Sequence, residues 1–470
     1  MATTRTGESG HAEHFGYVIF IAAAAAMGGF LFGYDSSVIN GAVTGIQKHF
    51  NVGTNATGFA VSSALLGSAF GAWIAGPIAD RIGRVKVMLI ASVLFVISGV
   101  LSGLAFSIVD LSIWRIVGGI AIGIASVVAP TYIAEIAPPQ YRGRLGSLQQ
   151  MAIVTGIFVS QLINYGLAQA ANGQTTNNIW GLQAWRWMLI IEAFPALLYG
   201  GLALAVPESP RYLIATHQTS RAQNVLHKVE GDNLDVDGRI AEIDHVIRSE
   251  HKPRFRDLLG PNGFVLPIVL IGIGLSIFQQ FVGINVIFYY SSLLWQSVGY
   301  NVSSSLLLSV STSIVNVVGT IVAISVIDRV GRKPLALIGS LGMTAALAVV
   351  AWAFSHVDKT SGVGSIPKSY GTTAIVGAHV FVFFFAMSWG VVVWVLLGEM
   401  FPNKIRALAL SVAASFQWLA NFAVSQSFPS LSRWSLTGSY TIYAVMALLS
   451  FFFVLKFVKE TKGKALEEMG

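Results

Sequence analysis

Long apolar runs alternate along the chain with short polar or charged segments. A transmembrane helix needs about 20 mostly apolar residues to cross the hydrocarbon core of a bilayer, and the sequence contains twelve runs of that kind. Their predicted limits are 16–41, 57–79, 87–106, 111–134, 147–169, 186–206, 264–295, 303–327, 334–355, 372–398, 405–428 and 437–458. The pattern therefore predicts an all-α protein that crosses a membrane twelve times.

The composition supports a membrane protein and excludes several other classes. Of the 470 residues, 54% are hydrophobic and 11% are charged, whereas a soluble domain carries about 25% charged residues. The net charge of +7 does not indicate nucleic-acid binding, because the basic residues lie in short loops between apolar runs. The absence of cysteine excludes disulfides and thiolate metal sites.

The basic residues also predict an orientation. When alternate loops and both termini are placed on one side, 23 of the 29 Lys and Arg residues fall on that side and four on the other. Cytoplasmic loops carry the excess of Lys and Arg, so both termini are expected in the cytoplasm. The polar first fourteen residues show no cleavable signal, and the first run is expected to remain as a span in the cytoplasmic membrane.

The sequence repeats itself across a long polar segment. EIAPPQYRGRLGS at Glu135–Ser147 matches EMFPNKIRALALS at Glu399–Ser411, and the basic turn at Asp80–Lys86 matches the turn at Asp328–Lys333. Two parallel six-span halves are the repeat pattern of the major facilitator fold, which places its substrate site at the midplane between them. The predicted organisation is an N-terminal tail (1–15), a first half (16–206), cytoplasmic amphipathic helices (207–263), a second half (264–458) and a C-terminal tail (459–470).

Acidic and basic residues recur together at the predicted cytoplasmic ends of the spans. A carboxylate at one helix end and a nearby guanidinium can pair bidentately, and such pairs are expected to hold the two halves closed on that side. The alternative is that the arginines only direct topology. The candidate gate residues are Asp80, Arg81, Arg84, Glu135, Arg142, Glu208, Arg211, Asp328, Arg329, Arg332, Glu399 and Arg406.

Three further charged residues lie inside spans. Asp35 is in the outer part of the first run, Arg115 lies near the outer start of the fourth, and Glu192 lies in the sixth. Charges at membrane depth are costly and mark functional sites. Asp35 is therefore either a proton-binding site or one partner in a structural salt bridge with Arg115, and position alone does not decide between these.

Polar and aromatic residues inside the spans are candidate ligands for a substrate. Amides donate and accept hydrogen bonds together, which suits hydroxyl groups, but a single buried amide also serves to join helices. Gln280 and Asn285 stand about 140° apart on an ideal helix, and Gly283 between them offers a break that brings both to one ligand. The candidates are Gln161, Gln279, Gln280, Asn285, Tyr289, Asn316, Trp389, Trp394, Gln417 and Asn421. The set contains no compact metal-ligand cluster and no pairing of a nucleophile with a base.

Several motifs resemble the sugar porter family of the major facilitator superfamily, especially its proton-coupled bacterial members. They are GPIADRIGRVK, PESPR, QQFVGIN, VIDRVGRK and ETKGK, and the resemblance covers about residues 16–468. It implies that the second half supplies most of the sugar ligands named above, with Gln161 added from span 5. It also implies that Asp35 is the proton-coupling acid, that Arg115 is its partner and that Glu192 assists.

Two departures from the family pattern stand out. The C-terminal motif has Lys459 where proline is usual. The stretch WGVVVW at Trp389–Trp394 lacks the proline common near the bend of span 10, so Gly390 alone is expected to allow bending there.

The sequence thus predicts a monosaccharide–proton symporter that works by alternating access, as a monomer in the lipid bilayer and without a cofactor. A facilitative uniporter on the same fold is the first alternative. A sugar sensor without transport activity is a second, and the short C-terminal tail argues against it. A membrane enzyme is a third, but no catalytic constellation supports it.

Overall fold

The computed structural model describes residues 6–137, 142–231, 235–249, 254–358, 364–402 and 404–462, with side chains described from Phe15 on and not for 142–146. Within this part of the chain, twelve helical segments are long and apolar enough to cross a membrane. They confirm the twelve spans predicted from the apolar runs. The first helix begins at Thr6, so helical structure extends into the segment expected to be an N-terminal tail.

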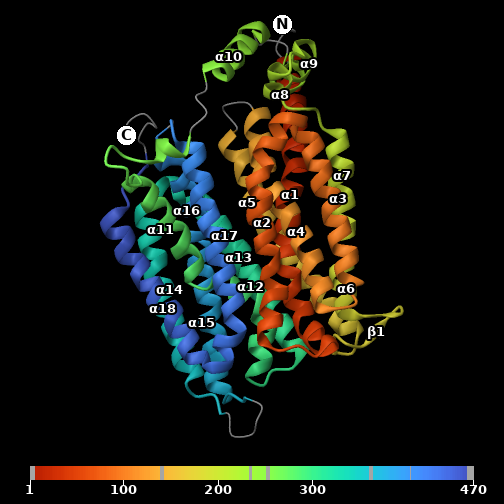
Figure 1. The fold of residues 1–470 in the computed structure, drawn as a ribbon, viewed down its shortest axis with the longest axis vertical. Helices are drawn as coiled ribbons and strands as arrows, with labels where there is room; N and C mark the ends of the chain where they lie inside the picture. Colours follow the sequence, from red (N-terminus) through yellow and green to blue (C-terminus); the bar gives the residue numbers. More distant parts are fainter. Residues whose placement is uncertain are drawn as a thin grey trace.

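The spans form two groups that lie side by side (Figure 1). The N-terminal half consists of α1 (Thr6–Phe50), α2 (Thr54–Ile82), α3 (Arg84–Gly103), α4 (Ile108–Ile136), α5 (Arg142–Ala170), and α6 (Ala184–Ile190) with α7 (Ala193–Ala205). The C-terminal half consists of α11 (Pro267–Phe281) with α12 (Ile284–Ser297), α13 (Val302–Val330), α14 (Arg332–Phe354), α15 (Lys368–Ala386) with α16 (Trp389–Met400), α17 (Arg406–Trp434) and α18 (Leu436–Phe457). A two-stranded hairpin, β1 (Asn178–Ile179) and β2 (Leu182–Gln183), precedes α6.

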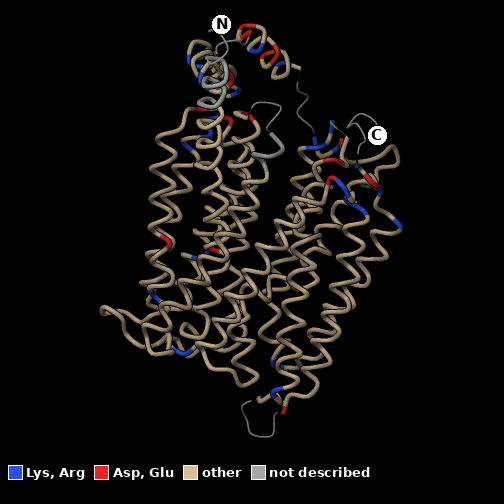
Figure 2. The backbone as a smooth tube through the Cα atoms, turned by 180° about the vertical axis from the view of Figure 1, so that it is seen from behind, with Lys and Arg blue, Asp and Glu red and all other residues tan. Residues whose placement is uncertain are grey.

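Short helices cover one end of the molecule. They are α8 (Pro210–Ala215), α9 (Thr219–Glu230) and α10 (Val236–Ser249), followed by the 3₁₀ turn η1 (Phe255–Leu258). In α9 the side chains of Ala222, Val225, Leu226 and Val229 are buried, which confirms the amphipathic pattern predicted for this segment. This end, where α1 begins and α18 ends, carries most of the charge (Figures 1 and 2). It is called the basic end below, and the other end the opposite end.

Three spans are interrupted near their middle. Gly283 separates α11 from α12 with a φ of 84°, which confirms the break predicted at this glycine. The break in span 10 lies at Ser388, two residues before Gly390, so the expectation that Gly390 alone bends this span is wrong. The Ser388 hydroxyl donates to the carbonyl of Phe384, which satisfies a backbone acceptor at the break. The break between α6 and α7 at Glu192 was not predicted.

Paired glycines bring α2 and α4 into backbone contact. A Cβ atom added at Gly67 would stand 2.1 Å from the carbonyl oxygen of Ile116, and one added at Gly119 would stand 1.9 Å from that of Ala64. Only glycine fits at such distances, and the same holds at Gly71 and Gly123, so the spacing of four residues in Gly67/Gly71 and Gly119/Gly123 lets the two helices pack closely. Arg115 lies on α4 one turn before Gly119 and is also buried.

Gly119→Ala is expected to destabilise the protein, because the added methyl group meets backbone that cannot move aside. Overpacking of this kind costs about 1–3 kcal/mol. Gly76→Ala, also within a span, is the matched control, since an added Cβ there meets nothing within 4 Å. Thermal unfolding in detergent should show a lower Tm for Gly119→Ala and an unchanged or higher Tm for Gly76→Ala. Equal melting temperatures for the two variants would contradict the close-packing account.

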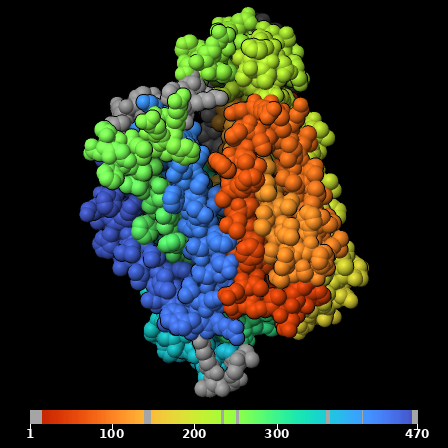
Figure 3. Space-filling view, in the orientation of Figure 1, coloured from red at the N-terminus to blue at the C-terminus, as the bar shows by residue number. Residues whose placement is uncertain are grey.

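The two halves meet from mid-depth to the opposite end. Where both partners are described, the hydrogen bonds that join the halves include Gln296 to Thr44 (3.1 Å) and Ser62 to Gln426 (2.8 Å). None of these cross-half bonds lies at the basic end. Figure 3 shows the same contact, with α2 and α17 touching along the lower part of the molecule. The structure is therefore sealed at the opposite end.

Candidate transport site

The first part of the site is an ion pair buried in the N-terminal half. Asp35 on α1 and Arg115 on α4 are 0% and 1% exposed. Nη1 of Arg115 donates to Oδ1 of Asp35 and also to the Asp35 backbone carbonyl, the latter at 3.1 Å. Two helices are thereby joined by a charge pair that is buried from bulk water.

A second carboxylate lies close to this pair. Glu192, at the break between α6 and α7, is 1% exposed, and its electrostatic neighbours are Asp35 and Arg115. Oδ2 of Asp35 and Oε1 of Glu192 are buried without a hydrogen-bond partner among the described groups. Two carboxylates that face one guanidinium leave one negative charge uncompensated, and burying such a charge costs several kcal/mol. The three residues, called the acidic trio below, are therefore suited to hold one proton.

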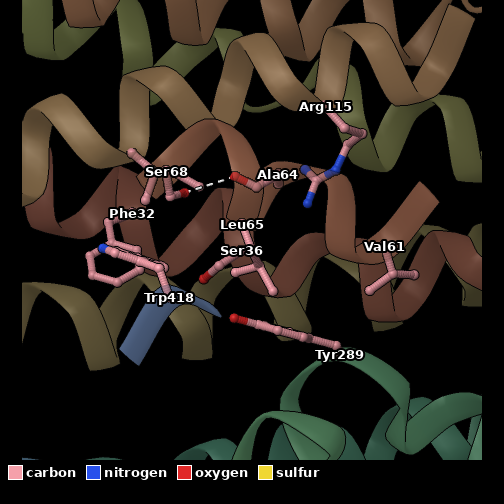
Figure 4. A pocket seen from close by; sticks show the side chains of 10 residues that line it. Phe32, Ser36, Val61, Ala64, Leu65, Ser68, Arg115, Tyr289 and Trp418 are labelled. Atoms are coloured by element: carbon pink, nitrogen blue, oxygen red, sulfur yellow. Dashed lines mark hydrogen bonds between the residues drawn. The ribbon is translucent and has the colours of Figure 1, made fainter. Parts of the chain in front are cut away.

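A small cavity connects the acidic trio with the C-terminal half. It is lined by Phe32, Ser36 and Arg115 on one side and by Tyr289 and Trp418 on the other. Figure 4 shows the hydroxyls of Ser36 and Tyr289 and the guanidinium of Arg115 directed toward the same space. The volume of this cavity, counted as the space that the centre of a water molecule can occupy, is about 10 Å³. This is roughly room for one water molecule.

Amides from three elements of the C-terminal half meet beyond this cavity. Nε2 of Gln279 donates to the carbonyl of Trp389 at 2.9 Å, and Nε2 of Gln417 donates to Oε1 of Gln279. Across the break at Gly283, Nδ2 of Asn285 donates to Oε1 of Gln280 at 2.6 Å. The predicted juxtaposition of Gln280 and Asn285 is thus confirmed. These residues form the amide cluster.

Tyr289 and Asn421 connect the amide cluster with the cavity. Nδ2 of Asn421 donates to the Tyr289 hydroxyl at 3.4 Å, and both side chains are buried. Asn316, on α13, is 5% exposed. Tyr289 also lines the cavity between the halves, and a sugar site at this interface stays a prediction.

The remaining three candidates stand apart from the amide cluster. The Trp389 ring is fully buried, and its Nε1 donates to Ser340 and Ala336 of α14, so only its carbonyl reaches the cluster. Trp394 is 40% exposed. Gln161 bonds to Asn40 of α1 at 2.9 Å. Sequence reasoning missed Asn40, although an asparagine inside an apolar run was a signal available to it.

At the basic end of the N-terminal half, one arginine joins two carboxylates. Arg84 pairs bidentately with Glu135 at 2.7 and 2.8 Å and with Asp80 at 2.9 Å. Glu208 accepts hydrogen bonds from the backbone N–H groups of Arg84 and Val85 at 3.0 and 3.2 Å. A carboxylate therefore satisfies the free N–H groups at the start of α3.

The C-terminal half repeats this arrangement. Arg332 pairs with Glu399 at 2.8 and 3.1 Å and with Asp328 at 3.0 Å. Glu460 accepts from the backbone N–H groups of Arg332 and Lys333 at 3.1 and 3.0 Å. The predicted repeat thus holds at the level of single hydrogen bonds, and Glu460 is a member that sequence reasoning did not single out.

Comparison with known proteins places the chain in a family. Residues 21–470 match the family profile described as "Sugar (and other) transporter". The chain belongs to the sugar transporter family. It is 54% identical to the glucose transport protein of Synechocystis sp. over 455 residues, which is 96% of this chain and 97% of that protein. It is 38% identical to the D-xylose-proton symporter of Escherichia coli over 486 residues, 96% of this chain and 95% of the other.

A solved structure shares the fold. The inward-open conformation of the xylose transporter XylE from E. coli matches with a TM-score of 0.83 and 37% identity, covering 96% of this chain and 99% of that one. This sugar transporter is therefore a protein of the major facilitator fold that carries sugar.

The expected ion pairs between the halves belong to a conformation that is closed at the basic end, and they stay a prediction. The described ion pairs of Arg84 and of Arg332 each lie within one half, because each arginine reaches the last turn of a neighbouring helix of its own half. Arg211 lies 3.9 Å from Glu135, also within its half, and Arg406 donates to the carbonyl of Phe401. Arg81 and Arg329 are exposed, and the side chain of Arg142 lies outside the described residues.

Glu460→Gln is expected to lower the Tm of the transporter at neutral pH. Burial acts to raise the pKa of Glu460, but four backbone N–H groups donate to its carboxylate and lower the pKa below the ordinary value of 4.5. A lowered pKa means that the stabilisation is present above pH 4.5 and is lost as the pH falls through the lower, folded-state value. Melting curves at several pH values should therefore show a constant difference at neutral pH that shrinks below pH 4.5. A difference that does not depend on pH would contradict this assignment.

Proposed function

We propose that this protein is a monosaccharide–proton symporter of the cytoplasmic membrane. The observation that carries the proposal is the acidic trio, in which Asp35 and Glu192 share Arg115 at a depth where water does not reach. A facilitative carrier has no need for such an uncompensated carboxylate. The printed name of one relative, a D-xylose-proton symporter, supports the same coupling.

The sugar is bound by the amide cluster and its neighbours. Gln280 and Asn285 offer paired donors and acceptors, Gln279 and Gln417 extend them, and Tyr289, Asn316 and Asn421 complete the polar wall. Trp394, which is 40% exposed, is a better candidate for the C–H face of a sugar than Trp389, which is fully buried. Glucose is the first candidate substrate, since the relative that is 54% identical is named a glucose transport protein.

Coupling follows from the position of the cavity between the two sites. When Asp35 binds a proton, its attraction for Arg115 weakens, and the guanidinium is free to turn toward Ser36 and Tyr289. Tyr289 contacts Asn421 of the sugar site, so occupancy of one site changes the contacts of the other. The two halves then exchange which end is closed. With both termini in the cytoplasm, as the positive-inside rule indicates, the present conformation faces inward.

Transport into reconstituted vesicles tests this proposal. Labelled glucose, xylose and galactose are offered with and without an inwardly directed proton gradient. The proposal requires that at least one sugar accumulates above its external concentration only with the gradient. Entry of sugar to the same equilibrium level with or without the gradient would instead identify a uniporter. Activity as a monomer, which we also propose, is checked by reconstitution at less than one protein per vesicle.

A further inference from the structure

A serine and a glycine surround the unpaired oxygen of Asp35. Nη1 of Arg115 donates to Oδ1 of Asp35, whereas Oδ2 has no hydrogen-bond partner among the described groups. A Cβ atom added at Gly118, on α4, would stand 2.6 Å from this Oδ2 and closer still to the hydroxyl of Ser98, on α3. The absence of a side chain at Gly118 thus leaves a space that Asp35 and Ser98 share, called the aspartate seat below.

The hydroxyl of Ser98 is a hydrogen-bond acceptor for this space. It donates to the backbone carbonyl of Trp114 at 2.8 Å, and because a carbonyl only accepts, the single proton of the serine is committed to that bond. The lone pairs of the Ser98 oxygen are left for a donor, and the residue is 1% exposed. Ionised Asp35 has no proton to offer, so only its protonated form can donate to Ser98.

The groups around the seat favour a proton on Asp35 over a proton on Glu192. The titratable groups that face Asp35 are Arg115 of α4, Glu192 between α6 and α7, Tyr34 of α1 and Tyr289 of α12, and among the described residues α2, α3 and α5 add none. The Tyr34 hydroxyl has no hydrogen-bond partner among the described groups, and Glu192 is its first electrostatic neighbour. A phenol offers a donor, which suits ionised Glu192, whereas Ser98 offers an acceptor, which suits protonated Asp35.

We propose that the coupled proton is carried on Oδ2 of Asp35 and that Ser98 and Gly118 position it there. A proton taken from water forms the O–H bond of the neutral carboxyl, which donates to Ser98, and release of the proton to water later in the cycle breaks that O–H bond again. Ser98 favours the protonated state by accepting, and Gly118 by leaving room. Neither residue exchanges the proton itself, so both are positioning residues. This assignment rests on the proposed proton symport, whose proton it places on one atom.

Infrared difference spectra between acid and alkaline pH test the seat without any need for transport. Protein labelled with ¹³C-aspartate should show a C=O band of a protonated aspartic acid that is missing in Asp35→Asn. In Ser98→Ala this band should lie at higher frequency, because a neutral carboxyl that donates to no acceptor has a stronger C=O bond. Ser92→Ala should leave the band unchanged. It is the matched control, since Ser92 is also on α3, is 4% exposed and donates to the carbonyl of Ala196 at 2.7 Å.

The pH dependence of proton-driven uptake of labelled D-glucose gives the second readout. Ser98→Ala removes one hydrogen bond from the protonated form, so half-maximal uptake should need a lower external pH, by about half a pH unit to one pH unit. Gly118→Ala should move the midpoint in the same direction, because the added methyl group displaces side-chain atoms of Asp35 and Ser98. Ser92→Ala should keep the wild-type midpoint.

The two readouts separate the seat from the transport function. A band that does not move in Ser98→Ala, or an unchanged midpoint of uptake in that variant, would overturn the assignment of the proton to this seat. The absence of the aspartic-acid band from the wild type, or its persistence in Asp35→Asn, would do the same. Wild-type vesicles without uptake driven by a proton gradient would overturn the proposed symport, while the infrared band would still decide where Asp35 holds a proton.

Discussion

Asp35→Asn should abolish accumulation of sugar against a gradient while sparing exchange of sugar across the membrane. The substitution keeps the shape of the side chain but removes the site where a proton binds and leaves in each cycle. Accumulation needs that proton, whereas counterflow needs only that the loaded carrier changes conformation. A gradient of one pH unit is worth about 1.4 kcal/mol, which allows about tenfold accumulation at one proton per sugar, and this ratio should fall to one in the variant.

The measurement is uptake of labelled sugar into reconstituted vesicles with an imposed pH gradient, beside counterflow in vesicles preloaded with unlabelled sugar. Asp110→Asn is the control, since Asp110 lies on α4 five residues before Arg115, but its carboxylate accepts hydrogen bonds from the backbone N–H of Phe106 and from Nε1 of Trp114. It should still accumulate sugar. If Asp35→Asn concentrates sugar as the wild type does, the acidic trio does not couple transport to the proton.

Gln280→Ala combined with Asn285→Ala should raise the KM for sugar by about ten- to a hundredfold. The two amides meet at 2.6 Å across the break at Gly283, so a sugar at that point exchanges bonds with both. Each lost hydrogen bond to a neutral group costs about 0.5–1.5 kcal/mol, and two of them account for the range. Initial uptake rates over a series of sugar concentrations provide the measurement.

The control for this pair separates ligand binding from helix packing. If the amides only hold helices together, the double variant should melt at a lower temperature and transport less at every sugar concentration with an unchanged KM. Gln223→Ala removes an exposed amide that bonds to Asp237 on α10, and it should change neither quantity. An unchanged KM in the double variant would exclude these amides from the sugar site.

Features encoded within one run of residues were predictable from the sequence. The twelve spans follow from apolar length alone, and the duplication follows from motifs that recur in order. The meeting of Gln280 and Asn285 followed from one glycine between two amides, because a residue without Cβ tolerates the positive φ found at Gly283.

Features that depend on contacts between distant segments were not predictable in the same way. Arg84 and Arg332 each reach a carboxylate in their own half, and nothing in the local sequence states which neighbouring helix supplies it. The break at Ser388 depends on a serine that bonds to its own preceding turn. Asn40 forms hydrogen bonds to Ser292 and Ser309, which are more than 250 residues away in the sequence, so the residues around Asn40 do not indicate these contacts.

The pH of a weakly buffered medium around de-energised vesicles tests the central claim most directly. Addition of glucose, or of whichever sugar the uptake panel selects, should make the external medium more alkaline as sugar and protons enter together. The change should be absent with the Asp35→Asn variant and should collapse when a protonophore is present. Entry of the sugar into wild-type vesicles without any change in external pH would contradict proton symport.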